Sequence, residues 1–426
     1  MTLTAAIATL GCKTNQFESA ALHESLETAG YRIVPFEAGA DLVVVNTCTV
    51  TAATDAQSRN LVRRARRLNA ACRVVVTGCY AQVDPTALKE LPGVALVLGN
   101  EEKRDLLRHL ADGAGVAVAP SRATTALPPP LSTFAGRSRA FVQIQNGCDA
   151  FCSYCIIPYA RGASRSVPAA AVIEQIRRLN PDYPEIVLTG IHIGGYGADL
   201  QPPTTLLALL HTIERETEVQ RLRLGSLEPT EIPAALIETV AASPVLCPHF
   251  HIPLQAGDDA VLQRMNRHYD SAFFRTLVTD IHARLPEAAI GLDVIAGFPG
   301  ETEAEFANTC QLIEDLPVSH LHVFPFSKRP GTPAGAMADQ ISGSLIKQRA
   351  ARLRQIGEAK QAAFARRFIG RTLEVVIEGG KRKGLCRGLT GNYLSVAFSG
   401  GDAKEGDLVA VRITDWTSAG LLGAAV

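Results

Sequence analysis

The chain has 426 residues, of which 47% are hydrophobic, so it is long enough to form two or three domains with substantial cores. Its 42 basic and 42 acidic residues give a formal net charge of zero, which excludes a protein that coats nucleic acid through overall positive charge. No apolar stretch is long enough to span a bilayer and the first residues lack a basic leader, so we expect a cytoplasmic protein with no membrane partner. In that compartment, its ten cysteines are expected to bind metal or act in catalysis rather than form disulfides.

The first 112 residues alternate short β-rich runs with amphipathic helical runs, which is typical of a parallel sheet. We therefore predict a small doubly wound α/β domain over residues 1–112. A segment rich in Ala, Pro, Ser, Thr and Arg follows over residues 113–138 and is expected to be a linker. The predicted strands lie at residues 4–9, 41–46, 73–77 and 94–98, and the predicted helices at 16–29, 54–69, 85–91 and 101–110.

Residues 139–369 resume the alternation, and six strand patterns separated by helical ones predict a partial parallel (β/α)6 barrel. Its last element is a long helix, rich in Arg and Lys, over residues 344–369. Short β-branched runs then predict a small antiparallel β-barrel over residues 370–426. The predicted strands of the first barrel are 140–145, 185–188, 221–224, 249–254, 290–296 and 320–326, and those of the second are 372–377, 384–390, 393–398 and 407–413.

Three cysteines directly follow the first strand of the predicted (β/α)6 barrel. Cys148, Cys152 and Cys155, the central cysteine set, have CxxxCxxC spacing with no fourth cysteine close by. Three thiolates hold three irons of a [4Fe–4S] cluster and leave the fourth iron open to a ligand such as S-adenosylmethionine (SAM). The alternative is a structural zinc site, which would need a fourth Cys or His ligand that this region lacks.

Three further cysteines lie just beyond the carboxyl ends of strands in the predicted N-terminal sheet. We call Cys12, Cys48 and Cys79 the N-terminal cysteine set. Because such strand ends meet at one edge of a parallel sheet, the three thiols are expected to converge and to hold a second cluster with an open iron. The alternative is that each is an ordinary buried cysteine. That interpretation fits the remaining ones, Cys72, Cys247, Cys310 and Cys386.

The blocks around these cysteines resemble those of the methylthiotransferase family of radical SAM enzymes. Within the family, the first two blocks are similar to the branch that modifies N6-threonylcarbamoyladenosine beside the tRNA anticodon. The resemblance covers almost the whole chain and includes a C-terminal barrel similar to a TRAM domain. It rests on residues 10–16, 46–51, 76–82, 157–162 and 297–302.

The resemblance implies methylthiolation of C2 of that nucleoside, with two SAM molecules used per turnover. A [4Fe–4S] cluster on the central cysteine set would reduce one SAM to a 5′-deoxyadenosyl radical, which removes hydrogen from C2. An auxiliary [4Fe–4S] cluster on the N-terminal cysteine set would carry the sulfur, which the other SAM methylates. The partners implied are the anticodon stem-loop of tRNA and an electron donor such as flavodoxin or ferredoxin.

Other functions remain open on the sequence. The same chemistry acts on isopentenyladenosine in tRNA and on a ribosomal protein in other branches of the family. A non-catalytic RNA-binding protein with a structural metal is an alternative of a different class.

Nine residues near the ends of the predicted barrel strands are expected to bind SAM. The resemblance implies that Gly190 and Gly297 let the backbone approach SAM, although each also suits a tight turn. A carboxylate at a strand end facing the barrel mouth, such as Glu228, is more often functional than structural. His251 and Gln255 line the same cavity or form a satisfied polar pair. The full set is Tyr154, Thr189, Gly190, Ser226, Glu228, His251, Gln255, Gly297 and Phe298.

Basic residues gather where the long helix joins the C-terminal barrel, and one more follows the central cysteine set. We expect them to contact tRNA phosphates, the alternative being a solvated charged face. Tyr393 and Phe398 are the candidates for base stacking, so phosphate contacts should outweigh base readout there. The predicted substrate-binding residues are Arg161, Arg366, Arg367, Arg371, Lys381, Arg382, Lys383 and Arg387.

Overall fold

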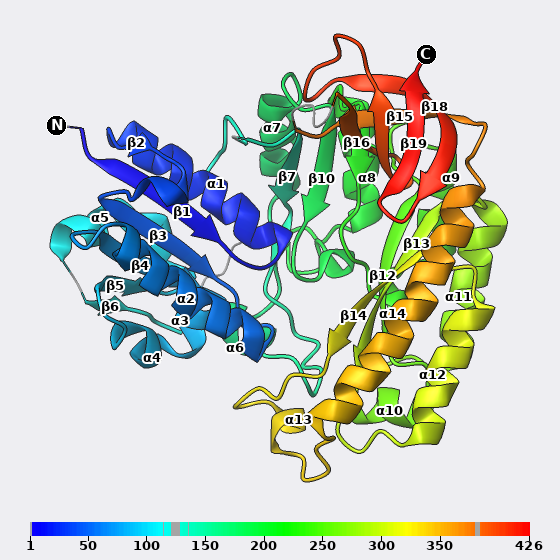
Figure 1. The fold of residues 1–426 in the computed structure, drawn as a ribbon, viewed down its shortest axis with the longest axis horizontal. Coiled ribbons are helices and arrows are strands. Elements are labelled where there is room, and N and C mark those ends of the chain that lie inside the picture. The colour runs from blue at the N-terminus through cyan, green and yellow to red at the C-terminus, as the bar shows by residue number, and fades with distance from the viewer. Residues whose placement is uncertain (1, 114, 121–127, 135, 380–383) are drawn as a thin grey trace.

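The computed structural model describes residues 2–113, 115–120, 128–134, 136–379 and 384–426 (Figure 1). At the N-terminal end, six parallel strands form one sheet in the order β2-β1-β3-β4-β5-β6. Its strands are β1 (Thr4–Thr9), β2 (Arg32–Ile33), β3 (Leu42–Thr47), β4 (Arg73–Gly78), β5 (Val94–Leu98) and β6 (Val116–Ala117). Its helices are α1 (Lys13–Thr28), α2 (Ala52–Leu68), α3 (Cys79–Val83), α4 (Pro85–Lys89) and α5 (Leu106–Asp112), with 3-10 turns η1 (Phe36–Ala38) and η2 (Glu102–Asp105).

Helices cover both faces of this sheet because its central strands are apolar on both sides. On β3, Val43 and Val45 belong to the buried cluster that includes Val62 of α2. Val44, between them, belongs to the cluster that includes Leu22 of α1. Successive residues of a strand point to opposite faces, so the run of valines supports helices on each side. The prediction of a doubly wound domain is confirmed.

The predicted parallel barrel follows, as two three-stranded sheets in the orders β7-β10-β11 and β12-β13-β14. A parallel bridge between Ser226 and His251 joins the two sheets. Among the described residues, no pairing joins β7 to β14, so the barrel is open along that side. Its strands are β7 (Arg139–Gln143), β10 (Glu185–Thr189), β11 (Arg221–Arg223), β12 (His249–Gln255), β13 (Ala289–Ala296) and β14 (His320–Pro325).

Helices surround this partial barrel, and a two-stranded hairpin of β8 (Gln145–Asn146) and β9 (Arg165–Ser166) brackets the central cysteine set. None of the helices in the described part of the chain is long and apolar enough to span a membrane. The helices are α6 (Ile157–Arg161), α7 (Ala169–Leu179), α8 (Leu206–Glu216), α9 (Ala234–Ala242), α10 (Asp259–Arg264), α11 (Ser271–Arg284), α12 (Glu303–Asp315), α13 (Pro333–Ala336) and α14 (Gly343–Arg366), with turns η3 (Ile193–Gly195) and η4 (Pro229–Glu231).

The core of the barrel extends beyond the barrel itself. Phe17 of α1 is buried in the same hydrophobic cluster as the barrel strands. Leu131 and Phe134, which lie in the segment expected to be a linker, are buried there too. That segment also supplies β6, the sixth strand of the N-terminal sheet. The N-terminal sheet and the barrel are therefore packed together rather than only tethered.

The C-terminal residues form a small closed barrel in the strand order β15-β16-β17-β19-β18. Sequence patterns predicted four of its strands but not β19, which closes the barrel by pairing parallel with β17 and antiparallel with β18. The strands are β15 (Thr372–Ile377), β16 (Cys386–Thr390), β17 (Ser395–Ser399), β18 (Leu408–Thr417) and β19 (Gly420–Ala425).

The turn between β16 and β17 sits against the amino ends of the parallel strands (Figure 1). Arg223 of β11 donates hydrogen bonds to the carbonyl oxygens of Thr390 (3.0 Å) and Gly391 (2.8 Å). The ring of Tyr393 stacks on His249 of β12, with centroids 4.5 Å apart. The small barrel thus covers the amino end of the larger one.

Glu185 of β10 is the carboxylate that makes this junction possible. It is fully buried and forms ion pairs with Arg139 (3.1 Å), Arg221 (2.7 Å) and Arg223 (2.7 Å). Burial opposes its ionisation, but the charges of Arg223, Arg221 and Arg139 outweigh burial and lower its pKa to about 2. Three guanidinium groups are therefore kept charged inside the protein by one carboxylate.

We expect Glu185→Ala to lower the free energy of unfolding by about 3–5 kcal/mol, because it leaves buried arginines without their partner. Urea unfolding followed by circular dichroism measures the change. Glu174→Ala is the matched control: it removes an exposed i,i+4 pair with Arg178 (2.9 Å), which should cost less than about 0.5 kcal/mol. Equal effects of the two substitutions would contradict the role given to Glu185.

Candidate active site

The structure places the three cysteines of the N-terminal set at one edge of the first sheet, as predicted from the strand ends. Cys12 is the N-cap of α1, Cys48 follows β3, and Cys79 is the first residue of α3. A Cβ atom at Gly11 would lie only 2.7 Å from Cβ of Cys48 and 2.9 Å from its Sγ. The loop that carries Cys12 therefore packs directly on Cys48, and only glycine fits there.

The electrostatics of this set suit a positively charged group. Burial raises the pKa of the Cys48 thiol, and so do the neighbouring Cys79 and Cys12. Together they bring it to about 11. Such a thiol does not ionise at neutral pH by itself. A bound metal centre supplies the positive charge that offsets burial and repulsion between thiolates.

The sulfurs of each cysteine set are spread more widely than those of a preformed four-thiolate zinc site. Zinc with four Zn–S bonds of about 2.3 Å holds its sulfurs about 3.8 Å apart. In the described part of the chain, neither cysteine set has its three sulfurs all within 4.8 Å of one another. This wider spacing fits the thiolates of an iron–sulfur cluster, each bound to a different iron.

Arg161 connects the two cysteine regions, although it was expected to contact tRNA. It is only 1% exposed. Its guanidinium donates to Oδ1 of Asn15 (2.6 Å), Oε1 of Glu18 (2.9 Å) and Oδ1 of Asn146 (3.0 Å). The side chain is therefore turned into the interior, and this position does not match the predicted phosphate contact.

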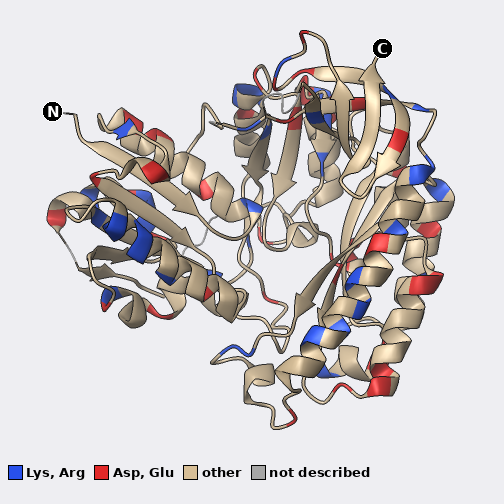
Figure 2. Cartoon of the chain, viewed as in Figure 1, with Lys and Arg blue, Asp and Glu red and all other residues tan. Residues whose placement is uncertain are grey.

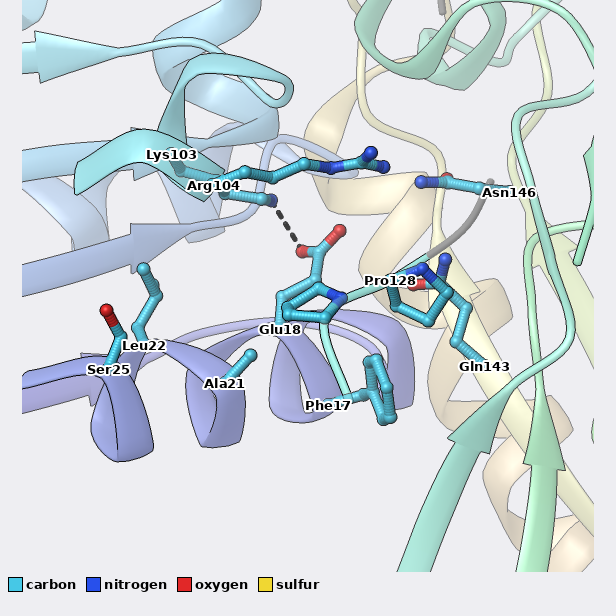
Figure 3. Close-up of a pocket in the computed structure, with 11 residues that line it drawn as sticks. Phe17, Glu18, Ala21, Leu22, Ser25, Lys103, Arg104, Pro128, Gln143 and Asn146 are labelled. Carbon is cyan, nitrogen blue, oxygen red and sulfur yellow. Dashed lines mark hydrogen bonds and ion pairs between the residues drawn. The ribbon is translucent and has the colours of Figure 1, made fainter. Parts of the chain in front are cut away.

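The acceptors of Arg161 are held in place by a second layer of contacts. Figure 3 shows Glu18 pointing from α1 toward Lys103, whose ammonium lies 2.6 Å away, with Asn146 across the pocket. Lys103 also donates to Asn100 (2.9 Å), which in turn donates to the carbonyl oxygen of Ala160 in α6 (2.7 Å). Burial opposes ionisation of Glu18, but Arg161 and Lys103 lower its pKa to about 2. This network could not be predicted from the sequence, because its members lie far apart along the chain.

The central cysteine set lies in the loop after β8, at the carboxyl end of the barrel strands. Nδ1 of His192 is 3.8 Å from Sγ of Cys148, and Nη1 of Arg267 donates to Sγ of Cys152 at 3.2 Å. Burial, with the neighbouring Cys152 and Cys148, raises the pKa of Cys155 to about 12. The same argument as for Cys48 applies: the Cys155 thiol needs a metal centre to become a thiolate.

The residues expected to bind SAM divide into two groups in the structure. Tyr154 and Gln255 line one cavity of about 620 Å³ together with Asp293 and Ile295. His251 is directed at Asp293, with Nε2 2.8 Å from Oδ1. These positions, near the central cysteine set, suit contact with a cofactor.

Of the other predicted SAM ligands, all but Ser226 are engaged with protein. Gly190 packs closely on Gln145, whose carbonyl oxygen would lie 2.9 Å from an added Cβ. Glu228 pairs with Arg267, and Ser226 is exposed beside the bridge to His251. Phe298 is buried in a small apolar cluster. Thr189 and Gly297 are also enclosed: Thr189 is buried, and Gly297 packs on Ile346 of α14.

The basic residues of the C-terminal region remain exposed where the structure describes them. Arg366, Arg367, Arg371 and Arg387 are exposed at the junction of α14 and the small barrel (Figure 2). Arg366 lies over the ring of Trp416, 4.8 Å from its centroid. Lys381, Arg382 and Lys383 lie outside the described residues.

The two aromatic residues expected to stack on bases are packed against other parts of the protein. Phe398 is fully buried in the core of the small barrel. Tyr393 packs against His249 and the guanidinium of Arg223 at the seat of the small barrel. The Phe398 ring is therefore not available to RNA, and the half-buried Tyr393 ring is already stacked on protein, because the strand pattern gave no information about which face is buried.

Family models match three consecutive parts of the chain. They are the Uncharacterized protein family UPF0004 over residues 4–99, the Radical SAM superfamily over residues 142–313 and the TRAM domain over residues 366–426. The fold agrees with two solved structures at low sequence identity. TsrM from Kitasatospora setae, a radical SAM methyltransferase, has a TM-score of 0.55 at 17% identity, with 79% of this chain and 77% of that one covered. OxsB, a cobalamin-dependent SAM radical enzyme, has a TM-score of 0.52 at 11% identity, with 81% and 56% covered.

Fold and cysteine loop together define the class: this is a radical SAM enzyme, which binds a [4Fe–4S] cluster and SAM. A threonylcarbamoyladenosine tRNA methylthiotransferase of Bacillus subtilis is 39% identical, covering 96% of this chain and 93% of that protein. The corresponding Thermotoga maritima enzyme is 34% identical over 98% and 96%. A tRNA-2-methylthio-N(6)-dimethylallyladenosine synthase of Desulfitobacterium hafniense is 33% identical over 97% and 95%. The chain belongs to the radical SAM tRNA methylthiotransferases, and its substrate is tRNA.

We expect Gly11→Ala to prevent assembly of a cluster on the N-terminal cysteine set, because the new methyl group would overlap Cys48. Anaerobically reconstituted protein should then hold about four irons per chain instead of about eight. Gly30→Ala is the matched control, since Gly30 has a similar positive φ (+86° against +98°) but no atom within 4 Å of the added Cβ. Full iron content in Gly11→Ala would refute the packing argument.

Proposed function

We propose that this enzyme methylthiolates C2 of N6-threonylcarbamoyladenosine next to the anticodon in tRNA. The observation that carries the proposal is the presence of two separate three-cysteine sets, one in each α/β domain, linked through the buried Arg161 network. A single set would suffice to cleave SAM. A second set with no fourth cysteine offers a second cluster with an iron free to carry sulfur.

The names of the relatives support the choice of nucleoside. The enzymes of B. subtilis and T. maritima are named for threonylcarbamoyladenosine, and the D. hafniense enzyme for dimethylallyladenosine. Because all three match nearly the whole chain, overall similarity alone does not choose between the two nucleosides.

With both clusters and two SAM molecules bound, the cofactors would supply a 5′-deoxyadenosyl radical and a methylated sulfur for insertion at C2. The residues of the chain have the task of holding these groups in place. Arg161 fixes the segment after Cys155 against the helix after Cys12. Arg267 donates to Sγ of Cys152 and so stabilises its thiolate form.

Reductive cleavage of SAM consumes an electron from outside the chain. We propose a flavodoxin or ferredoxin as the donor, because the cluster would need a one-electron carrier of low potential. Arg366, Arg367, Arg371 and Arg387 are exposed and positively charged, which suits contact with tRNA phosphates.

Single cysteine substitutions should separate the two halves of the reaction. Cys148→Ala should abolish formation of 5′-deoxyadenosine from SAM in the reduced enzyme. Cys48→Ala should still form 5′-deoxyadenosine but yield no methylthio product. Cys310→Ala, at a partly buried cysteine of α12 outside both sets, is the control and should retain both activities. Loss of both activities in Cys48→Ala, with iron content intact at the central set, would contradict this division of labour.

The substrate is tested by mass analysis of nucleosides from tRNA of a strain that lacks this enzyme. We expect loss of the 2-methylthio form of threonylcarbamoyladenosine and accumulation of the unmodified precursor. Loss of the 2-methylthio form of dimethylallyladenosine instead would assign the enzyme to the other branch.

A further inference from the structure

Helix α2 of the N-terminal domain carries a row of arginines along one side, as its basic colouring in Figure 2 shows. Arg59, Arg63 and Arg67, the arginine row, follow one another at intervals of four residues and therefore share a side of the helix. Arg63 and Arg67 are exposed, and no carboxylate among the described residues pairs with any of the three. Asp55, the acidic residue of α2, is buried in an ion pair with Arg329 (2.6 Å). The row thus concentrates positive charge in a chain whose net charge is zero.

The arginine row lies on the side of α2 that faces α3. Nη1 of Arg59 donates to the hydroxyl oxygen of Tyr80 in α3 (2.8 Å). Helix α3 packs in turn on α6, the short helix that follows the central cysteine set (Figure 1). Arg64 is on the other side of α2, where it pairs with Glu37 of η1 (2.7 Å). The row therefore runs along the side of the N-terminal domain that meets the loop of the central cysteine set.

Two exposed aromatic residues, Phe151 and Tyr159, lie in that loop and in α6. Their rings, the aromatic pair, make an edge-to-face contact with centroids 5.9 Å apart. Their exposed fractions, 50% and 54%, exceed those of every other Phe, Tyr or Trp among the described residues. Large aromatic side chains usually contribute to a core or to an interface. The aromatic pair therefore marks a surface suited to a partner.

The backbone fixes Phe151 in its exposed position. Its φ of 45° lies in the left-handed region, which is uncommon for a residue with a side chain. Asn266, which is left-handed as well (φ 59°), donates from Nδ2 to the carbonyl oxygens of Phe151 (3.1 Å) and Ala150 (3.4 Å). Residues held in such sparsely populated conformations cluster at sites that bind ligands. A defined loop conformation thus holds this ring at the surface.

The arginine row and the aromatic pair both border the cavity of about 620 Å³. Val50 and Thr51 line this cavity together with Tyr154. Val50 and Thr51 follow Cys48, and Thr51 is the N-cap of α2. Tyr154 is three residues after Phe151 in the loop of the central cysteine set. A base that enters the cavity is therefore flanked by the start of α2 on one side and by this loop on the other.

An RNA stem-loop has the chemistry that fits this combination of side chains. Arginines neutralise phosphates without regard to base sequence. Exposed aromatic rings stack on bases that are unpaired, which is how proteins recognise single-stranded RNA loops. The anticodon arm of tRNA offers both groups in one molecule, because it is a paired stem closed by an unpaired loop.

We propose that the anticodon arm docks across this face, with stem phosphates on Arg63 and Arg67 and unpaired loop bases stacked on Phe151 and Tyr159. The inference rests on the proposed function only in taking the anticodon arm as the part of tRNA that reaches the cavity. It adds an RNA-binding surface on the N-terminal domain and the cysteine loop, separate from the exposed arginines of the C-terminal barrel. Because stem and loop are bound by different side chains, their contributions are measured separately.

Fluorescence anisotropy of the reconstituted enzyme with a labelled anticodon stem-loop RNA measures the arginine contacts. Arg63→Gln combined with Arg67→Gln should raise Kd about 10-fold and reduce the slope of log Kd against log salt by about 1.4–1.8, because two phosphate contacts are lost. The matched control combines Arg64→Gln with Arg108→Gln, at two exposed arginines of the same domain that already pair with carboxylates. It lowers the net charge equally and should change Kd less than about 2-fold. Equal effects of the two double variants would overturn the role of the arginine row.

The stacking contact is tested with the same probe. Tyr159→Ala should raise Kd about 5- to 100-fold with an unchanged salt slope, the range for loss of one stacked base, whereas Tyr159→Phe should keep the wild-type Kd. The effect should vanish for a probe whose stem is closed by a polyethylene glycol linker in place of the loop bases. Phe273→Ala is the control, at an exposed aromatic residue of α11 on the outer side of the barrel (Figure 1). An unchanged Kd in Tyr159→Ala, or an equal loss with the linker probe, would overturn the stacking contact.

The outcomes also separate this inference from the proposed function. Iron content and 5′-deoxyadenosine formation without RNA are measured for every variant, so that a defect in cluster assembly is seen apart from a defect in RNA binding. Normal RNA affinity in both the arginine and the Tyr159 variants, with methylthiolation by wild-type enzyme, would overturn the docking surface alone. The expected losses of affinity, with no methylthio-threonylcarbamoyladenosine formed by wild-type enzyme, would refute the proposed function and leave the docking surface in place.

Discussion

The buried guanidinium of Arg161 is the contact on which the arrangement of the two cysteine sets depends. Removing a charge from water is costly unless ion pairs and hydrogen bonds replace the lost hydration. Arg161 has both, from Glu18 and Asn15 of α1 and from Asn146 of β8. Because its partners lie just after Cys12 and just before Cys148, satisfying this one side chain also fixes the two loops that carry these cysteines.

A second buried carboxylate, Glu185, has the corresponding role at the other end of the barrel. Its three arginines hold the turn of the C-terminal barrel over the amino ends of the strands, while the central cysteine set lies at their carboxyl ends. Strands of six residues or so span about 20 Å. An RNA bound by the exposed arginines near Arg371 must therefore run along the flank of the barrel to bring a base to the cysteines.

The sequence predicted those features that depend on local pattern. Strand ends placed the N-terminal cysteine set at one edge of the sheet, CxxxCxxC spacing marked the central set, and alternation of strands and helices predicted both α/β domains. It missed β19, because the strand contains no β-branched residue: its sequence is Gly-Leu-Leu-Gly-Ala-Ala. An added Cβ at Gly423 would lie 2.6 Å from Cγ1 of Val411, so the closure of the small barrel requires a residue that carries no strand signal.

Long-range contacts account for the remaining differences. Arg161 looked like an exposed cation because its acceptor Glu18 is more than a hundred residues away, and Tyr393 looked available to RNA because its neighbours His249 and Arg223 lie in another domain. Lys13 was within a block used for family resemblance, yet only the packing of Phe17 shows which way that helix face points.

Substrate choice has to be explained by side chains whose surroundings depend on contacts between distant parts of the chain. Relatives named for two different nucleosides match the chain over almost its full length, so the fold and the sulfur chemistry are common to both. A hydrocarbon pocket discriminates weakly against a polar analogue, whereas a site with a buried polar group strongly rejects a ligand that leaves this group unpaired. Discrimination between a charged and an apolar nucleoside therefore depends on which buried polar groups of the site the wrong ligand leaves unpaired. Selection of this kind requires no change in the barrel.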